Sequence, residues 1–131
     1  GQGGRMGAAL VGQCKAAGLP AQIIAVGANS AATAAMLKAG ADAAATGENP
    51  VVVNARTADI IAGPMGILTA NALLGEITPA MAAAVSESPA QKLLIPVNRC
   101  SVTVVGVSQL PLGEYVRLAV QEASALLNEE D

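Results

Sequence analysis

The sequence predicts a doubly wound α/β sandwich in three layers, with a mostly parallel sheet between two layers of helices. Short apolar runs alternate with longer stretches of helical periodicity, and this alternation is typical of parallel sheets. Glycines and hydrogen-bonding side chains collect directly after the apolar runs, where open α/β sheets bind their ligands. The length of 131 residues suits one domain, so we expect residues 1–131 to form a single unit.

The expected elements follow this alternation in order. A helix over 6–17 places Met6, Leu10 and Cys14 on one face. A buried strand over 22–26 precedes Ser30, the expected cap of the next helix. The remaining expected elements are a helix over 31–39, a strand over 41–46, a short helix after Asn49-Pro50, a strand over 59–62, helices over 67–74 and 78–86, strands over 92–95 and 102–107, and a helix over 112–127.

Two connections determine the expected topology. Only Val97 to Ser101 separate the strand over 92–95 from the last strand, and a parallel crossover needs about a dozen residues. Val102–Val107 is therefore expected to be an antiparallel edge strand. At the other end, the chain opens on a glycine cluster with no strand before it, so we expect a first strand upstream of Gly1. With that strand counted, the expected order is 3-2-1-4-5-6.

The opening stretch "GQGGRMG" predicts a phosphate-binding loop. It does not match G-x-G-x-x-G, because Met6 stands where the third glycine belongs, but it fits G-x-x-G-x-x-G through Gly1, Gly4 and Gly7. A glycine loop before a helix leaves backbone N–H groups free to meet phosphate oxygens. Arg5 either contacts a phosphate or is a solvated residue of the first helical turn.

Further candidate binding residues follow the other expected strands. Turns commonly contain Gly, Asn and Ser, yet the turns at the opposite ends of the strands, 18–20 and 38–40, are plain. The predicted binding residues are Gly1, Gly3, Gly4, Arg5, Met6, Gly7, Asn29, Ser30, Thr33, Gly63, Pro64, Met65, Asn98 and Arg99.

The residues after the second strand bear on the choice of cofactor. NAD-binding sheets place an acidic residue there to hold the ribose hydroxyls, whereas this sequence has Asn29, Ser30 and Thr33. The missing carboxylate would tolerate a 2′-phosphate, although no arginine follows to bind one. NAD or NADP is therefore the best single guess, NADP being weakly favoured, and a smaller phosphorylated or carboxylated metabolite stays open.

Composition excludes several function classes. The net charge is −3, no basic cluster occurs, and Tyr115 is the only aromatic residue, so we do not expect nucleic acid as a partner. Without histidine, neither a Ser-His-Asp nor a Cys-His pair nor a His-based zinc site can form. We expect no metal site, because no ligand cluster occurs. The uncharged run 16–37 is interrupted by polar residues and Pro20, which favours a strand and a helix over a membrane span.

Catalytic candidates are few. Cys100 follows Asn98-Arg99, and a thiol beside a guanidinium can act as a nucleophile or redox sensor; a small residue under a hairpin is the alternative. Glu48, at a strand end, is a candidate general base or ribose ligand, and Glu76 is a candidate cap. The two cysteines are interpreted as reduced thiols, which agrees with a cytoplasmic location. Whether the protein is an enzyme stays open.

Two resemblances extend this interpretation. The loop "GQGGRMG" resembles the nucleotide loop of dihydrodipicolinate reductases over seven residues, but the histidine-rich catalytic stretch of those enzymes cannot exist here. Over nearly its whole length the chain resembles a family of short bacterial proteins classed as a domain of unknown function and regarded as Rossmann-like. The segments that carry this resemblance are "VGANSAATAAMLKAGADAAATGEN", "ADIIAGPMGILTANALLGEITPAM" and "LIPVNRC". Members of that family begin with a short strand of the type "KIAVID" before the glycine loop.

Three functional hypotheses follow. The leading one is a Rossmann-like protein that binds a nucleotide or another small phosphorylated metabolite, its reaction unknown. The alternative is a non-catalytic homo-oligomeric scaffold or partner-binding protein, in which "GPMGILTANALLG" (63–75) and the alanine-rich faces pack against a second copy. The third is an oligomeric enzyme whose site is completed by another chain.

Overall fold

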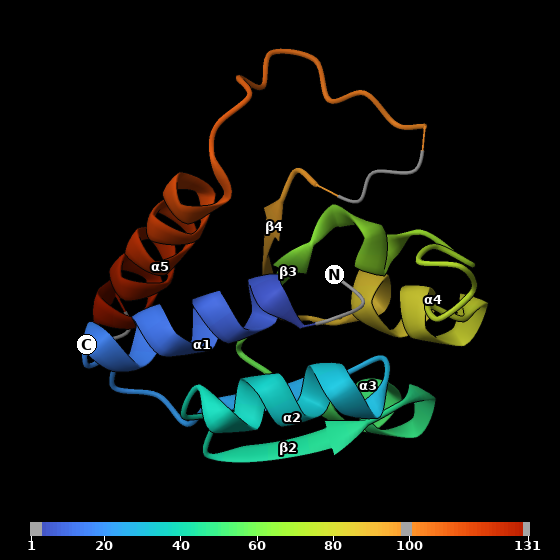
Figure 1. Cartoon of the computed structure of the whole chain (residues 1–131), viewed down its shortest axis with the longest axis horizontal. Helices are drawn as coiled ribbons and strands as arrows, with labels where there is room; N and C mark the ends of the chain where they lie inside the picture. Colours follow the sequence, from blue (N-terminus) through green and yellow to red (C-terminus); the bar gives the residue numbers. More distant parts are fainter. Residues whose placement is uncertain (1–3, 98–100, 130–131) are drawn as a thin grey trace.

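The computed structural model describes residues 4–97 and 101–129, and these form a mixed α/β arrangement (Figure 1). Within this part of the chain, five α-helices and one 3₁₀ helix surround two pairs of short parallel strands. The alternation of strands and helices that the sequence predicts is confirmed.

The first strand pair is built from one strand–helix–strand unit. Its strands run parallel, with Ile24 opposite Ala43 and Gly27 opposite Thr46. Helix α1 precedes the unit and packs against its connecting helix α2. The elements are α1 (Arg5–Ala16), β1 (Ile24–Gly27), α2 (Ser30–Lys38) and β2 (Ala43–Thr46).

The second strand pair repeats this plan. Its strands are also parallel, from Ile60 opposite Gln91 to Pro64 opposite Ile95. The expected pairing of strands within each half is thus confirmed. The elements are α3 (Glu48–Ala55), β3 (Ile60–Pro64), the 3₁₀ helix η1 (Met65–Leu68), α4 (Pro79–Glu87), β4 (Gln91–Ile95) and the closing helix α5 (Leu112–Glu129).

Two helix starts differ from the sequence expectation. Asn29, and not Ser30, caps α2: its side-chain oxygen accepts the N–H of Ala32 at 2.8 Å, a role for which Asn and Ser are about equally suited. Helix α3 begins at Glu48, ahead of the expected Asn49-Pro50 start.

Three small hydrophobic clusters hold the described residues together. The first joins α1 to α5 and β4, the second joins α4 to the segment after η1, and the third joins α1 to β1. Their buried members are Met6, Leu10, Ile95, Val116 and Val120 in the first; Ala72, Ile77, Met81 and Ala82 in the second; and Val11, Ala25 and Ala41 in the third. Helix α1 contributes to two clusters and is the central packing element.

The expected antiparallel edge strand Val102–Val107 is wrong. These residues form irregular chain with a turn at Val105 and Gly106, and Val105 is 94% exposed. Gly106 takes a φ of 85°, which interrupts an extended run. Three β-branched valines favour a strand, but a strand also needs a partner edge, and these residues pair with no described strand.

The expected helix over 67–74 is also largely wrong. Only Met65–Leu68 is helical, and it is a 3₁₀ turn. The chain then forms turns in which Leu73 and Leu74 both have φ of 57°, a region that non-glycine residues rarely adopt. The apolar periodicity of this segment therefore reflects packing of a compact loop against α4, and not an α-helix.

Candidate functional site

The segments that follow β1, β2 and η1 meet through a group of polar side chains, which we call the carboxyl-end cluster. Its members lie at the ends of strands or the beginnings of helices, where the first N–H groups of a helix have no partner in the helix itself. The carboxyl-end cluster consists of Asn29, Thr33, Thr46, Glu48, Glu76 and Thr78.

Asn29 is the centre of this cluster. Its amide oxygen caps α2, and its amide nitrogen donates a 2.7 Å hydrogen bond to Oε2 of Glu76. Glu76 precedes α4, so this bond joins the end of β1 to the second half of the chain. Glu76 was expected to cap its own turn, and the structure brings it instead to Asn29.

Thr33 ties α2 to the end of β2. Its hydroxyl lies 2.7 Å from the hydroxyl of Thr46 and within 3.1 Å and 3.3 Å of the carbonyl oxygens of Asn29 and Ala45. A Cβ at Gly27 would lie 2.3 Å from Oγ1 of Thr33. A glycine at the end of β1 therefore allows the first turn of α2 to close over the strand.

Glu48 links the start of α3, just after β2, to the start of α4. Its Oε1 accepts a 2.5 Å hydrogen bond from the hydroxyl of Thr78, which in turn accepts the N–H of Met81 as the cap of α4. Glu48 is the first residue of α3, where a negative charge is favoured by the helix dipole. The structure thus gives this candidate base a bridging position.

The glycines of the opening loop have a packing role. Gly4 precedes α1 with φ of 78°, and a Cβ there would lie 2.7 Å from Cα of Ala32 in α2. A Cβ at Gly7 would lie 2.5 Å from Sδ of Met36. These two glycines let α1 approach α2 closely, so the beginnings of the two helices lie side by side.

The other predicted binding residues divide into three groups. Met6 is 3% exposed and packs in the core, so only its backbone can meet a ligand, whereas Arg5 and Ser30 are exposed. Gly63, Pro64 and Met65 lie where β3 passes into η1. Gly1, Gly3, Asn98 and Arg99 lie outside the described residues, as does the catalytic candidate Cys100.

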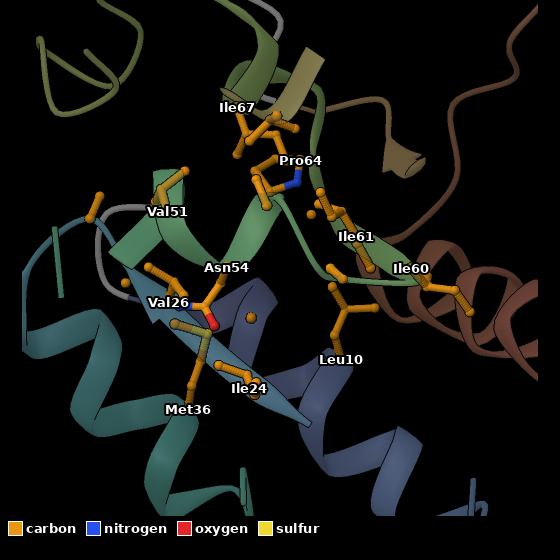
Figure 2. A pocket seen from close by; sticks show the side chains of 18 of the residues that line it. Leu10, Ile24, Val26, Met36, Val51, Asn54, Ile60, Ile61, Pro64 and Ile67 are labelled. Carbon is orange, nitrogen blue, oxygen red and sulfur yellow. The ribbon is translucent and has the colours of Figure 1, made fainter. Parts of the chain in front are cut away.

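A cavity of about 500 Å³ lies between β1 and β3, beside α1 (Figure 2). Ile24 and Val26 line it from β1, and Ile60 and Ile61 line it from β3. Gly4, at the start of α1, lies in the same lining. The cavity is mainly aliphatic and adjoins the carboxyl-end cluster through Gly27 and Ala28.

The pKa values of Cys14 and Asp42, which lie outside the carboxyl-end cluster, are shifted. Burial raises the pKa of the Cys14 thiol, which packs against the α1–α5 core as the sequence predicted. The N–H of Ile23 and the ammonium of Lys15, each 2.7 Å from the carboxylate of Asp42, lower the pKa of Asp42.

In residues 4–97 and 101–129, no group of three or more side chains could hold a metal ion. No helix in this part of the chain combines the length and apolarity needed to cross a bilayer.

Comparison with known protein families identifies one family for this chain. One family model matches residues 1–128. The chain belongs to this family, a domain of unknown function, DUF3842. No curated protein and no solved structure matches it.

Sequence reasoning missed two features of the DUF3842 chain. The contacts Asn29–Glu76 and Glu48–Thr78 join residues 47 and 30 positions apart, and local sequence patterns cannot predict contacts over such distances. The packing role of Gly4 and Gly7 was missed as well, although the alanine-rich helix 31–39 was a signal that helices approach each other closely.

Proposed function

We propose that this DUF3842 chain binds a small phosphorylated ligand at the carboxyl-end cluster, with a nicotinamide dinucleotide as the first candidate. One observation carries the proposal: α1 and α2 begin side by side, with Gly4 packed against Ala32. Helix N-termini attract anions, because their first N–H groups and their dipoles point outward. Two helix N-termini at one edge favour the binding of a phosphate group between Gly4 and Ser30.

We also propose that the two strand pairs are halves of one Rossmann-like, doubly wound sheet. Support comes from the parallel direction of both pairs, from the glycine turn before α1, and from the bond Asn29–Glu76, which joins the halves at one edge. In such sheets a dinucleotide lies across the point where the strand order reverses. For this chain that point lies between β1 and β3.

Glu76 bears on which dinucleotide binds. Its carboxylate lies 2.7 Å from the Asn29 amide, at the end of β1, where dinucleotide-binding sheets hold the ribose hydroxyls with an acidic side chain. This carboxylate accepts hydrogen bonds from hydroxyls and repels a 2′-phosphate. The weak preference for NADP suggested by the sequence is therefore replaced by a preference for NAD.

Thermal melting with added ligand tests the proposal. NAD at about 100 times its dissociation constant stabilises the folded chain by about 2.7 kcal/mol, a shift of several degrees. We expect NADP to give a smaller shift, and Glu76→Gln to reduce the difference between the two. Glu87→Gln, at the exposed end of α4, is the matched control and leaves the difference unchanged. A melting temperature that stays at the ligand-free value with NAD, NADP, ATP and inorganic phosphate would contradict the proposal.

A second candidate function, a homo-oligomeric scaffold, rests on exposed apolar side chains. Leu74 and Val105 are 95% and 94% exposed, and Val102, Val107 and Leu110 add to the apolar surface of the chain before α5. Apolar surface of this kind marks interaction sites. Light scattering distinguishes the two candidate functions. If the chain forms a dimer that is lost on Leu74→Ser or Val105→Ser, and if no ligand changes the melting temperature, the scaffold is favoured.

A further inference from the structure

Residues 101–111, which we call the arm, run outside the body of the molecule in the connection between β4 and α5 (Figure 1). Every residue of the arm except Val104 is exposed. No backbone group of residues 102–107 forms a hydrogen bond with another described segment. The described part of the chain therefore leaves the arm largely uncovered.

The exposed side chains of the arm are mainly apolar. Four aliphatic side chains in it are at least 37% exposed: Val102, Val105, Val107 and Leu110. No charged residue occurs in the stretch 101–113. An uncharged, β-branched segment with free backbone groups favours pairing with another apolar strand, whereas a charged partner such as nucleic acid finds no opposite charge here.

Tyr115 anchors the arm to the first turn of α5. Its hydroxyl donates a 2.5 Å hydrogen bond to the carbonyl of Ser108 and accepts the N–H of Leu110 at 3.2 Å. Its ring packs against the hydrophobic cluster shared by α1, β4 and α5. The part of the arm next to α5 is therefore held in place, while residues 102–107 project from it.

The exposed area of the chain suits association with a second copy. The folded chain exposes 7126 Å², whereas a compact monomer of this mass exposes about 6,300 Å². The excess is about 800 Å², which is the area that one partner contributes to an interface of standard size. In a twofold dimer both copies bury the same patch, so one exposed arm on each copy supplies both sides of the contact.

We propose that the arm is a dimerisation element, in which residues 102–105 of one copy pair with residues 102–105 of a second copy. A twofold axis through the middle of this segment makes the two strands antiparallel and places Val105 opposite Val102 of the second copy. Gly106, with φ of 85°, ends the paired stretch. The second copy thus supplies the partner edge that these valines lack within one chain. This inference rests on the second candidate function, the homo-oligomer, and not on nucleotide binding.

The hydroxyl of Tyr115 supplies the first test. Tyr115→Phe keeps the ring in the core and removes the two hydrogen bonds that hold the arm. We expect the dissociation constant of the dimer, measured by analytical ultracentrifugation, to rise by about fivefold or more, with the helix content unchanged by circular dichroism. An unchanged dissociation constant would overturn the proposal that an anchored arm forms the interface.

Charged substitutions in the arm test the pairing itself by light scattering. We expect the parent chain to be a dimer, and Val105→Lys and Val102→Glu each to be monomeric, because a lone charge in an apolar strand pair has no partner. An equimolar mixture of the two variants should recover the dimer, since the new charges are opposite in sign and face each other across the strands. Both side chains are exposed in the single chain, so each variant should keep its helix content.

Leu118→Glu is the matched control, because Leu118 is an exposed apolar residue of α5 outside the arm. We expect this variant to remain a dimer. A monomeric parent chain, or a mixture of Val105→Lys and Val102→Glu that stays monomeric, would overturn the proposal. A dimer that survives both arm substitutions but is lost on Leu74→Ser would also overturn it, while leaving the homo-oligomeric scaffold as a candidate function.

Discussion

The carboxyl-end cluster and the cavity between β1 and β3 are neighbours, but they differ in chemistry. In the cluster, Asn29, Glu48 and Thr33 form hydrogen bonds with polar groups of other segments, at 2.5 to 3.3 Å. In the cavity, strand edges carry aliphatic side chains and face no described strand. The two halves are thus joined by polar contacts at one end of the strands and by the packing of α1 on both of them, whereas β1 and β3 do not pair with each other.

This difference separates a hydrogen-bonded polar edge from a loosely packed apolar region. The polar bridges hold helix beginnings and strand ends in fixed positions, which a ligand-binding edge requires. The cavity lacks the packing that gives a parallel sheet its stability. Substitutions in the two regions should therefore have different consequences for the free energy of unfolding.

The largest effect is expected where α1 faces a complete core. Met6 is 3% exposed among residues of α5 and β4, so Met6→Ala should destabilise the chain by about 2–5 kcal/mol. Leu10→Ala, one turn further and facing the cavity, should cost less, because its surroundings are already partly open. Urea unfolding measures both changes. A loss of unfolding free energy for Leu10→Ala equal to or larger than that for Met6→Ala would show that Leu10 is as tightly packed as Met6.

The next effect concerns the end of β1. In Gly27→Ala the new Cβ meets Oγ1 of Thr33 at 2.3 Å and the backbone nitrogen of Thr33 at 2.6 Å, so α2 must shift. We expect a loss of about 1–3 kcal/mol in unfolding free energy. Gly12→Ala, in α1 with open space around its Cβ, is the control and should be neutral or stabilising. A neutral Gly27→Ala would mean that α2 does not close over the strand.

A smaller loss is expected from Asn29→Ala, which removes the cap of α2 and the partner of Glu76. Loss of such a cap costs about 1 kcal/mol. Asn29→Asp keeps an oxygen for the Ala32 N–H but places a second carboxylate beside Glu76, so it should not restore full stability. Thermal denaturation of the three chains checks this order, and an Asn29→Asp chain as stable as the parent would exclude the Asn29–Glu76 contact.

The smallest effect lies outside both regions, at Asp42. The N–H of Ile23 and the ammonium of Lys15 lower the pKa of this carboxyl in the folded chain. Its contribution to stability is therefore present above its unfolded pKa and is lost as the pH falls through the lower folded value. Unfolding measured from about pH 5 down to about pH 2 should show a weaker acid dependence for Asp42→Asn. An unchanged dependence would assign the acid sensitivity to other carboxylates.

The sequence predicts local elements well where the signal is local. The strand over 22–26 and the helices over 78–86 and 112–127 all depend on neighbours within a few residues, and the structure has β1, α4 and α5 near these places. Parallel direction within each pair also follows, because a helix separates the paired strands.

Features that depend on distant partners could not be predicted in this way. Val102–Val107 has strand composition but no partner edge, and Leu73 and Leu74 take left-handed backbone conformations that their types disfavour. The carboxylate beside Asn29 comes from Glu76, which the spacing of dinucleotide motifs does not reach. The sequence therefore predicted that polar side chains follow β1 and β2, whereas the contacts between those side chains and Glu76 and Thr78 were not predicted.

We propose that a phosphorylated ligand binds where α1 and α2 begin. The most direct measurement is an NMR titration of the ¹⁵N-labelled chain with NAD. We predict saturable amide shifts centred on Gly4, Arg5, Ser30 and Glu76, with smaller shifts for NADP at the same concentration. Amides at these positions that do not move up to millimolar NAD, while shifts occur elsewhere or nowhere, would contradict the claim.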